Sequence, residues 1–490
     1  FNKTAMSTLC SLFSFADLWT ILSFSYTIFV VAVVVIVIAE RREPVKTLAW
    51  VMVITMFPVG GMVLFVIFGQ NHHKQRTFRR KELLDAETID SLCRQQLSGL
   101  AEQEHLALTD KSVARLMLNN NKSLLTLHNR VRILNNGEQT FPDMFGAMAE
   151  AREFIHIEFF AIEGGELFDH LCNVLEERIR AGVKVRIIYD SVGSRQLRKS
   201  DRQRLVDMGA EVHSFMPVLV SRFTSTANYR NHRKAVIIDG RVGYLGGMNI
   251  ADRYLYGSEL GPWRDTHFRI EGGGVAGLQA AFLKDWSATT RLKVEGAPYF
   301  ACEPIPAKEN VVQILSGGPF GKWRVLLQGV SMAVMRARSR IWIETPYFLP
   351  SETLNNALQT AALAGVDVRL MLPLRSDSKV VDLAIHSYID DMMRAGVKIY
   401  FYMAGFLHSK LMVVDDELAV FGSSNMDFRS FEHNFEINAF AYDEALVGEL
   451  QQLYEADIEH CHLLTHSEWF NRSRLRKFAE SIMRLFSPLL

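Results

Sequence analysis

The sequence predicts an α/β protein made of two similar halves with pseudo-two-fold symmetry, preceded by a two-helix transmembrane hairpin. Three observations carry this prediction: two long uncharged runs near the N-terminus, a strand–helix pattern that occurs twice beyond about residue 125, and one polar motif in each copy. The 490 residues, 49% of them hydrophobic, exclude a disordered chain and supply enough apolar side chains for several domains.

The N-terminal runs are the first element. Residues 18–39 and 47–69 are uncharged and, as helices, each is long enough to cross about 30 Å of hydrocarbon. A buried core helix or a cleaved signal peptide fits two such runs in succession poorly. Residues 1–81 are therefore predicted to form a membrane hairpin with a basic juxtamembrane segment. Six basic residues outside the pair against three in its loop place the remainder of the chain in the cytoplasm.

The internal repeat follows a connector to which the sequence assigns no function. Aligning Ile155 with Ile341 also aligns Glu158 with Glu344, and each copy then continues with a helix and further strands. Strands alternating with helices indicate a parallel-rich sheet covered by helices. The predicted divisions are the connector at 82–125, a first half at 126–300 and a second half at 301–465.

Each half carries a His-x-Lys-x4-Asp motif with an asparagine 17 residues after the histidine. Residues i and i+2 of a strand face the same side, so the histidine and lysine of each motif are expected to face one ligand. Two copies with identical spacing would rarely arise by chance. The candidate residues are His232, Lys234, Asp239 and Asn249 in the first copy, His408, Lys410, Asp415, Ser423 and Asn425 in the second, and Asp265 and Glu436 on the stretches that follow.

These side chains suit substitution at a phosphodiester. A neutral imidazole can attack phosphorus and form a phospho-histidine, while a second, protonated imidazole donates to the leaving alkoxide and then deprotonates the acceptor. The lysines and asparagines can stabilise the phosphoryl oxygens, and Asp265 and Glu436 are each expected to hold a ring N–H and set its tautomer. This chemistry needs no metal and no cofactor, and the histidines do not show zinc-site spacing.

The paired motifs resemble those of the phospholipase D superfamily, in which two HKD motifs build one active site between two α/β halves. The chain is more similar still to bacterial cardiolipin synthases, through its apolar N-terminus, GGMNIADRYLYG after the first motif and GSSNMDFRS after the second. The resemblance implies a phosphatidyltransferase that joins two phosphatidylglycerols into cardiolipin and glycerol through a phosphatidyl-histidine. It implies His232 as nucleophile and His408 as general acid/base, although the residues alone also allow the reverse. Gly247 stands where the superfamily often has serine.

Two other reactions fit the same residues, and one function outside enzymes is also considered. The site would also serve a membrane-bound phosphodiesterase with water as acceptor, or transfer to another alcohol such as serine. A membrane scaffold with a degenerate site is the alternative outside enzymes, and the intact motifs argue against it. The expected partners are phosphatidylglycerol and anionic membrane lipid, with a homo-oligomer left open, and the expected location is the bacterial inner membrane, which the chain crosses more than once.

The C-terminal residues 466–490 are predicted to form a basic amphipathic helix. Apolar residues recur there at helical spacing among five basic and two acidic residues. The pattern fits an interfacial helix on anionic lipid, or an ordinary terminal helix packed on the domain. Residues 1–81 hold nine basic and three acidic residues, so the neutral total of 54 against 54 conceals an acidic body, which argues against nucleic acid as a partner.

Overall fold

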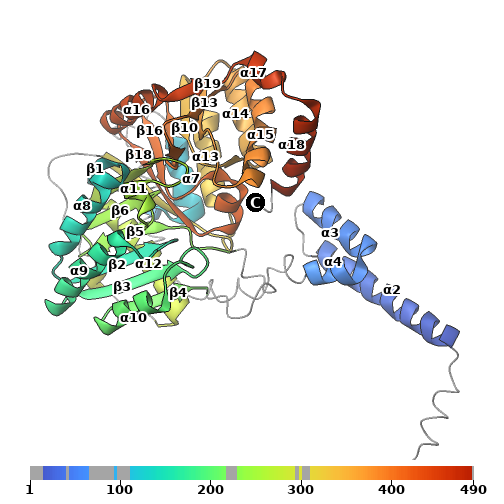
Figure 1. Ribbon diagram of the computed structural model, residues 1–490, viewed down its shortest axis with the longest axis horizontal. Helices are drawn as coiled ribbons and strands as arrows, with labels where there is room; N and C mark the ends of the chain where they lie inside the picture. Colours follow the sequence, from blue (N-terminus) through green and yellow to red (C-terminus); the bar gives the residue numbers. More distant parts are fainter. Residues whose placement is uncertain are drawn as a thin grey trace, which may run out of the picture. The chain divides into compact units, whose positions relative to one another are not determined.

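The computed structural model describes residues 15–39, 44–65, 93–96, 111–216, 229–292, 297–300 and 310–487. The chain divides into two compact units, Phe1–Lys74 with Leu219–Asn228, and Gln75–Val218 with Tyr229–Leu490. The smaller unit contains the N-terminal helices and the larger one contains the sheet (Figure 1). Most of the predicted connector and the predicted basic segment before residue 81 lie outside the described residues.

The smaller unit contains helices α2 (Phe15–Ala39), α3 (Pro44–Met56) and α4 (Pro58–Leu64). The second predicted helix, over residues 47–69, is divided in two at Phe57. Pro58 has no N–H to continue the helix, and its ring keeps the preceding residue out of helical geometry. Among the residues described, none of the helices has both the length and the apolar character that crossing a bilayer requires.

A single sheet of 15 strands runs through the described part of the larger unit, in the order β4-β3-β2-β5-β6-β8-β1-β9-β18-β16-β15-β10-β12-β13-β19. The strands of the first half are β1 (Leu125–Asn135), β2 (Phe154–Phe159), β3 (Lys184–Asp190), β4 (Glu211–Phe215), β5 (Lys234–Ile238), β6 (Val242–Gly246) and β8 (Thr266–Glu271). The strands of the second half are β9 (Asn310–Gly317), β10 (Arg340–Glu344), β12 (Asp367–Pro373), β13 (Lys398–Tyr402), β15 (Leu411–Val414), β16 (Leu418–Gly422), β18 (Glu436–Tyr442) and β19 (Cys461–Leu463).

The strand order repeats outward from the antiparallel pair β1–β9 at the centre, which confirms the prediction of two similar α/β halves. The predicted alignment holds in register, since Ile155 of β2 pairs with Ile238 and Ile341 of β10 pairs with Val414. The sheet is mixed rather than parallel-rich. Within it, parallel pairing is confined to β2-β3-β4 and β10-β12-β13. The tight turns after β5 and β15 make β5–β6 and β15–β16 antiparallel hairpins.

Helices cover both faces of this sheet. Residues of α12 and α16 join a core that extends across both halves, where the rings of Phe268 and Phe421 stack at 3.7 Å. Separate cores cover the opposite face, one in each half. The helices are α7 (Lys111–Asn121), α8 (Asn136–Ala149), α9 (Glu166–Arg180), α10 (Lys199–Asp207), α11 (Arg253–Tyr256), α12 (Gly274–Thr290), α13 (Val325–Arg336), α14 (Glu352–Leu363), α15 (Lys379–Arg394), α16 (Glu444–Ile458), α17 (His466–Phe470) and α18 (Arg474–Phe486).

Two short parallel pairings join the halves beside the motifs. Strand β7 (Trp263–Arg264) pairs with β14 (Phe406–Leu407), immediately before His408. On the other side, Asn231 forms a parallel bridge with Phe435. Each motif histidine is therefore held beside a segment of the opposite half.

Candidate active site

The histidine and lysine of each motif lie together at the start of a hairpin strand. His232 and Lys234 enter β5, and His408 and Lys410 immediately precede β15. The two-residue period of extended chain turns both side chains of a motif the same way, as the sequence predicts. The lysine Nζ donates to the histidine carbonyl oxygen in each motif, at 2.6 Å for Lys234. All four side chains are largely buried.

The two histidines are held by carboxylates from opposite halves. His232 Nδ1 lies 2.9 Å from Glu436 Oε1, and His408 Nδ1 lies 2.7 Å from Asp265 Oδ2. The backbone sets this crossing, because the His232 N–H donates to the Phe435 carbonyl and the His408 N–H donates to the Arg264 carbonyl. A carboxylate only accepts, so each Nδ1 carries the proton and each Nε2 carries the lone pair.

Burial controls the charge states of the four motif side chains. It lowers the pKa of His232 to about 4 against the attraction of Glu436, and it lowers the pKa of His408 well below its usual value with help from Lys410 and Lys234. Burial also lowers the pKa of Lys234 to about 7 and that of Lys410 to about 8. Without an anion, the site therefore holds two neutral imidazoles and two lysines that are easily deprotonated.

The two carboxyl groups differ in their surroundings. Burial raises the pKa of Asp265 to about 6, although Lys410 opposes it. Burial acts on Glu436 in the same direction, but His232, Lys234 and the Ser423 hydroxyl together hold the pKa of Glu436 below its usual value. Glu436 is therefore the more firmly ionised of the two.

Ser423 and Gly247 occupy equivalent positions and explain part of this difference. The Ser423 hydroxyl donates to Glu436 Oε2 at 2.5 Å and accepts from the Ile437 N–H at 2.9 Å, so it supports the acid from the neighbouring backbone. A Cβ at Gly247 would lie 2.3 Å from Asp265 Oδ1. A serine at that position would therefore collide with the carboxylate that holds His408.

The two asparagines predicted to bind phosphoryl oxygens donate to protein atoms in this structure. Asn249 Nδ2 donates to the Tyr254 hydroxyl at 3.0 Å, and Asn425 Nδ2 donates to Asp427 Oδ2 at 3.2 Å. Tyr254, which the sequence reasoning missed, also lies 3.4 Å from His408 Nδ1. Its position five residues after Asn249 was the available signal.

The motif aspartates are not brought together with the histidines. Asp239 accepts hydrogen bonds from the backbone N–H groups of residues 152, 153 and 154, where β2 begins. Asp415 accepts from residues 338, 339 and 340 before β10 in the same way. Each lies at the far end of its four- or five-residue strand from the histidine. The described contacts of both aspartates are therefore with the backbone that begins β2 and β10, and their catalytic role stays a prediction.

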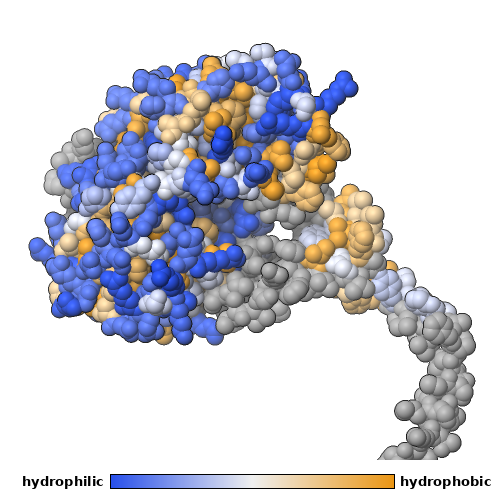
Figure 2. All heavy atoms as spheres, viewed as in Figure 1, coloured by the Kyte–Doolittle hydropathy of each residue, from blue (hydrophilic) through white to orange (hydrophobic). Residues whose placement is uncertain are grey.

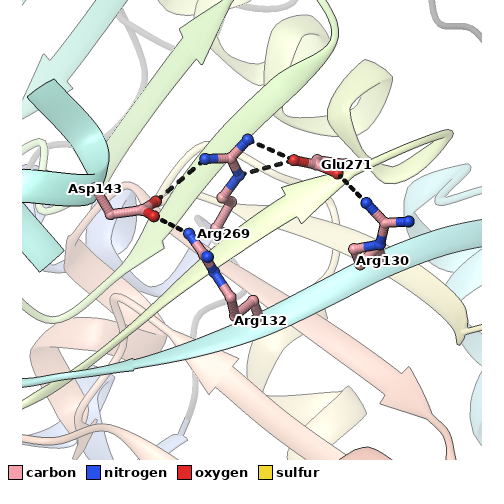
Figure 3. Close-up of a pocket in the computed structure, with 5 residues that line it drawn as sticks. All are labelled: Arg130, Arg132, Asp143, Arg269 and Glu271. Atoms are coloured by element: carbon pink, nitrogen blue, oxygen red, sulfur yellow. Dashed lines mark hydrogen bonds and ion pairs between the residues drawn. The ribbon is translucent and has the colours of Figure 1, made fainter. Parts of the chain in front are cut away.

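A separate polar pocket of about 270 Å³ lies between β1, α8 and β8 (Figure 3). The pocket-lining residues are Arg130, Arg132, Asp143, Arg269 and Glu271. The arginines are paired with the two carboxylates that face them, and none of the predicted site residues lines the pocket.

Among the described residues no group of three or more His, Cys, Asp or Glu is arranged to hold a metal ion.

Solved structures of low sequence identity share this fold. The phosphatidylserine synthase of Haemophilus influenzae superposes with a TM-score of 0.58 at 17% identity, covering 77% of this chain and 97% of that one. The polyphosphate kinase of Porphyromonas gingivalis superposes with a TM-score of 0.50 at 13% identity, covering 69% and 49%. At these identities the likeness concerns the fold alone.

Sequence comparison gives the family. Residues 144–260 and 331–458 match the family described as "Cardiolipin synthase, PLD-like domain", and residues 27–70 match "Phospholipase_D-nuclease N-terminal". The cardiolipin synthase of Halalkalibacterium halodurans is 38% identical over 97% of this chain and 96% of its own. That of Geobacillus kaustophilus is 38% identical over 94% and 92%. The chain therefore belongs to the cardiolipin synthase family, and it is an enzyme of the phosphatidyltransferase type.

Proposed function

We propose that this enzyme transfers a phosphatidyl group from one phosphatidylglycerol to a hydroxyl of a second, giving cardiolipin and glycerol. The observation that carries the proposal is the crossed arrangement of two buried histidine–carboxylate pairs, at 2.9 and 2.7 Å. The carboxylates accept the Nδ1–H of both rings, so both Nε2 atoms are available for a two-step substitution. One Nε2 acts as the nucleophile and the other transfers the proton.

In the first step, His232 Nε2 attacks phosphorus. The N–P bond forms as the bond from phosphorus to the glycerol oxygen breaks, and His408 gives its Nε2 proton to that oxygen. Glu436 stabilises the positive charge that grows on the His232 ring, since its carboxylate accepts the Nδ1–H. Lys234 and Lys410 stabilise the non-bridging oxygens.

In the second step, the neutral His408 takes a proton from a hydroxyl of the second phosphatidylglycerol. The new O–P bond forms, the N–P bond breaks, and His232 is released. Although the pKa of His408 is low in the site as described, an anionic phosphodiester bound between the lysines favours the protonated ring and also keeps both lysines charged. Binding of substrate thus prepares the acid for the first step.

Product analysis tests the proposal. Purified full-length enzyme is given phosphatidylglycerol labelled in its terminal glycerol, and lipid products and free glycerol are measured together. We expect one glycerol for each cardiolipin, and loss of both products in the variants His232→Ala and His408→Ala. His460→Ala, which alters an exposed histidine outside the motifs, is the matched control and should retain activity. Phosphatidic acid without cardiolipin would instead identify a phosphodiesterase, and a serine-dependent product would identify another acceptor.

We also propose that residues 1–81 attach the enzyme to the bacterial inner membrane as the predicted hairpin, with the catalytic halves, 126–300 and 301–465, on the cytoplasmic side. The two uncharged runs support this, as do the exposed apolar side chains of α2, including Val31, Val35 and Ile36. Cell membranes washed with alkaline carbonate should retain the full chain. Its release into the wash would exclude an embedded hairpin.

A further inference from the structure

Helix α18 turns its apolar side toward solvent. Leu475 and Leu485 are 78% and 77% exposed, and Phe478 is 64% exposed. With 100° between successive residues, these side chains fall on one stripe of the helix together with Ile482 and Phe486, which are also exposed. In Figure 2 apolar atoms gather where Figure 1 places α18.

The charged side of α18 is the side that packs on the protein, against α15. Glu480 is buried and accepts from Arg472 at 2.7 Å and from Arg476 at 3.3 Å. Further along the helix, Arg484 donates to Asp391 at 2.7 Å. Rotating the helix to hide its apolar stripe would break the pair of Glu480 with Arg472, which precedes α18, and the pair of Arg484 with Asp391 of α15. These two pairs therefore fix the outward orientation.

We propose that α18 lies in the headgroup region of an anionic bilayer with this stripe inserted among the acyl chains. Residues 466–490 carry five basic and two acidic residues, and Glu480 and Glu468 are both occupied within the protein. Arg474 borders the stripe, and the net positive charge of the segment matches a negative surface. The choice of an anionic lipid rests in part on the proposed function, because the proposed substrate is anionic. The orientation of the helix does not depend on that function.

Two other occupants of the stripe are less well matched in charge. A second copy of the chain would bring its own positively charged C-terminal segment against this one. Helix α3 carries one lysine and no acidic residue, and Asp17 is the single acidic residue of α2, so these helices offer little to pair with a positively charged segment. An anionic lipid surface matches both the apolar stripe and the net positive charge of the segment that carries it.

Contact with the bilayer at α18 would also orient the second half of the active site. Helix α15 contacts both α18 and β11 (Phe348–Leu349), and β11 pairs with β17 (Met426–Asp427), directly after Asn425. These packed elements join the lipid-facing helix to the second motif's polar segment. The stripe would therefore set the height of the site above the bilayer for both lipid substrates.

Fluorescence in reconstituted full-length enzyme tests the location. An environment-sensitive fluorescent amino acid replaces Phe478 in one sample and, as a control, Leu127 of β1 in another, since Leu127 is 46% exposed but far along the chain from α18. In phosphatidylglycerol vesicles we expect a blue shift and quenching by brominated acyl chains at 478 only, both weaker in phosphatidylcholine vesicles. Shielding at 478 that is insensitive to brominated lipid would show that the N-terminal helices or a second copy cover the stripe, and would overturn the proposal.

Activity tests the consequence. In the double variant Phe478→Glu with Leu485→Glu, we expect cardiolipin formation on phosphatidylglycerol vesicles to fall on the order of tenfold, with little change in mixed detergent micelles. The matched control, Leu127→Glu with Val206→Glu, adds the same charge at exposed apolar positions elsewhere and should lose neither activity. Equal rates on vesicles for the two double variants would overturn the proposal. If the wild-type enzyme formed no cardiolipin in micelles, the proposed function would be refuted. The proposal about α18 would still be tested, because the fluorescence measurement does not require catalysis.

Discussion

The two histidine pairs of the site share a backbone frame and differ in the acid that holds each ring. His232 is paired with Glu436, which also accepts from Ser423, whereas His408 is paired with Asp265, where the position of that serine is taken by Gly247. The backbone around each pair is built by the same order of strands, counted from β1 in the first half and from β9 in the second. The two halves thus present one backbone geometry twice, and a few differing side chains give the two rings different surroundings.

The difference fits different tasks for the two histidines. Glu436, whose pKa is held below its usual value by His232, Lys234 and Ser423 although burial opposes them, suits a ring that becomes positively charged on forming the N–P bond. Burial raises the pKa of Asp265 to about 6, so its carboxylate accepts the Nδ1–H of His408 less strongly. That suits a ring that must both give and take a proton. This comparison supports His232 as nucleophile and His408 as acid/base, which the motif spacing alone leaves symmetric.

The largest expected effect separates the two histidines by leaving group. On phosphatidylglycerol, His408→Ala should lose on the order of 10²–10⁴-fold in rate, the usual contribution of general acid catalysis, and His232→Ala should lose more. On a substrate whose glycerol is replaced by nitrophenol, the leaving group needs no proton. His408→Ala should then still release a burst of nitrophenol in stopped-flow measurements, and His232→Ala should release none. A burst from His232→Ala alone would reverse the assignment.

Removing the acids should have the next largest effect. Glu436→Gln should lower kcat by roughly 10³-fold, as expected when the acid that orients a catalytic histidine is lost. Asp265→Asn should cost roughly tenfold less, because Asp265 is the more weakly ionised acid. Steady-state assays in mixed micelles measure both variants, and thermal unfolding checks that each is folded. Equal losses would mean that the two acids are functionally equivalent.

The dependence of kcat/KM on pH should show both sides of the comparison. As pH falls through about 6, Asp265 gains a proton and no longer accepts from His408 as a carboxylate, so the rate falls. As pH rises through about 7 to 8, Lys234 and Lys410 lose their charge and bind phosphate less well, so the rate falls again. Asp265→Asn should remove the acid limb and keep the alkaline one. An acid limb that survives this substitution would assign it to another group.

The motif aspartates should show the smallest effect on chemistry. Asp415→Asn replaces a carboxylate that accepts from three backbone N–H groups and the Ser339 hydroxyl, and should lower the free energy of unfolding by about 1–3 kcal/mol, with kcat nearly unchanged. Although burial opposes them, these hydrogen bonds lower the pKa of Asp415. Its contribution is thus present above the unfolded pKa and is lost as pH falls through the folded one.

Thermal unfolding by circular dichroism, combined with kcat at a permissive temperature, measures this effect. Asp416→Asn is the matched control, since the neighbouring Asp416 is exposed and pairs only with the surface Arg340 and Gln451 side chains among the described contacts. A large fall in kcat for Asp415→Asn without loss of stability would return the aspartate to the catalytic machinery.

Sequence spacing determined the two halves and the histidine–lysine pairs, because strand period and repeat length are local properties of the chain. It also identified the acids and the apolar stripe of the C-terminal helix. Pro58 indicated a kink in the second run, where the structure breaks at Phe57. The sequence did not predict the antiparallel share of the sheet, although short turns followed β5 and β15. The alternation of strands with helices outweighed that local signal.

Only the tertiary structure decided which acid holds which histidine, what Asp239 and Asp415 bind, and which side of α18 faces the protein. The crossed pairs join residues 204 and 143 positions apart, and no local spacing encodes a contact between halves. The aspartates lie in the motif, yet four or five residues of strand carry them to the end opposite the histidines. An amphipathic pattern defines two helix faces without saying which is buried, and here the pairs of Glu480 with Arg472 and of Arg484 with Asp391 made that choice.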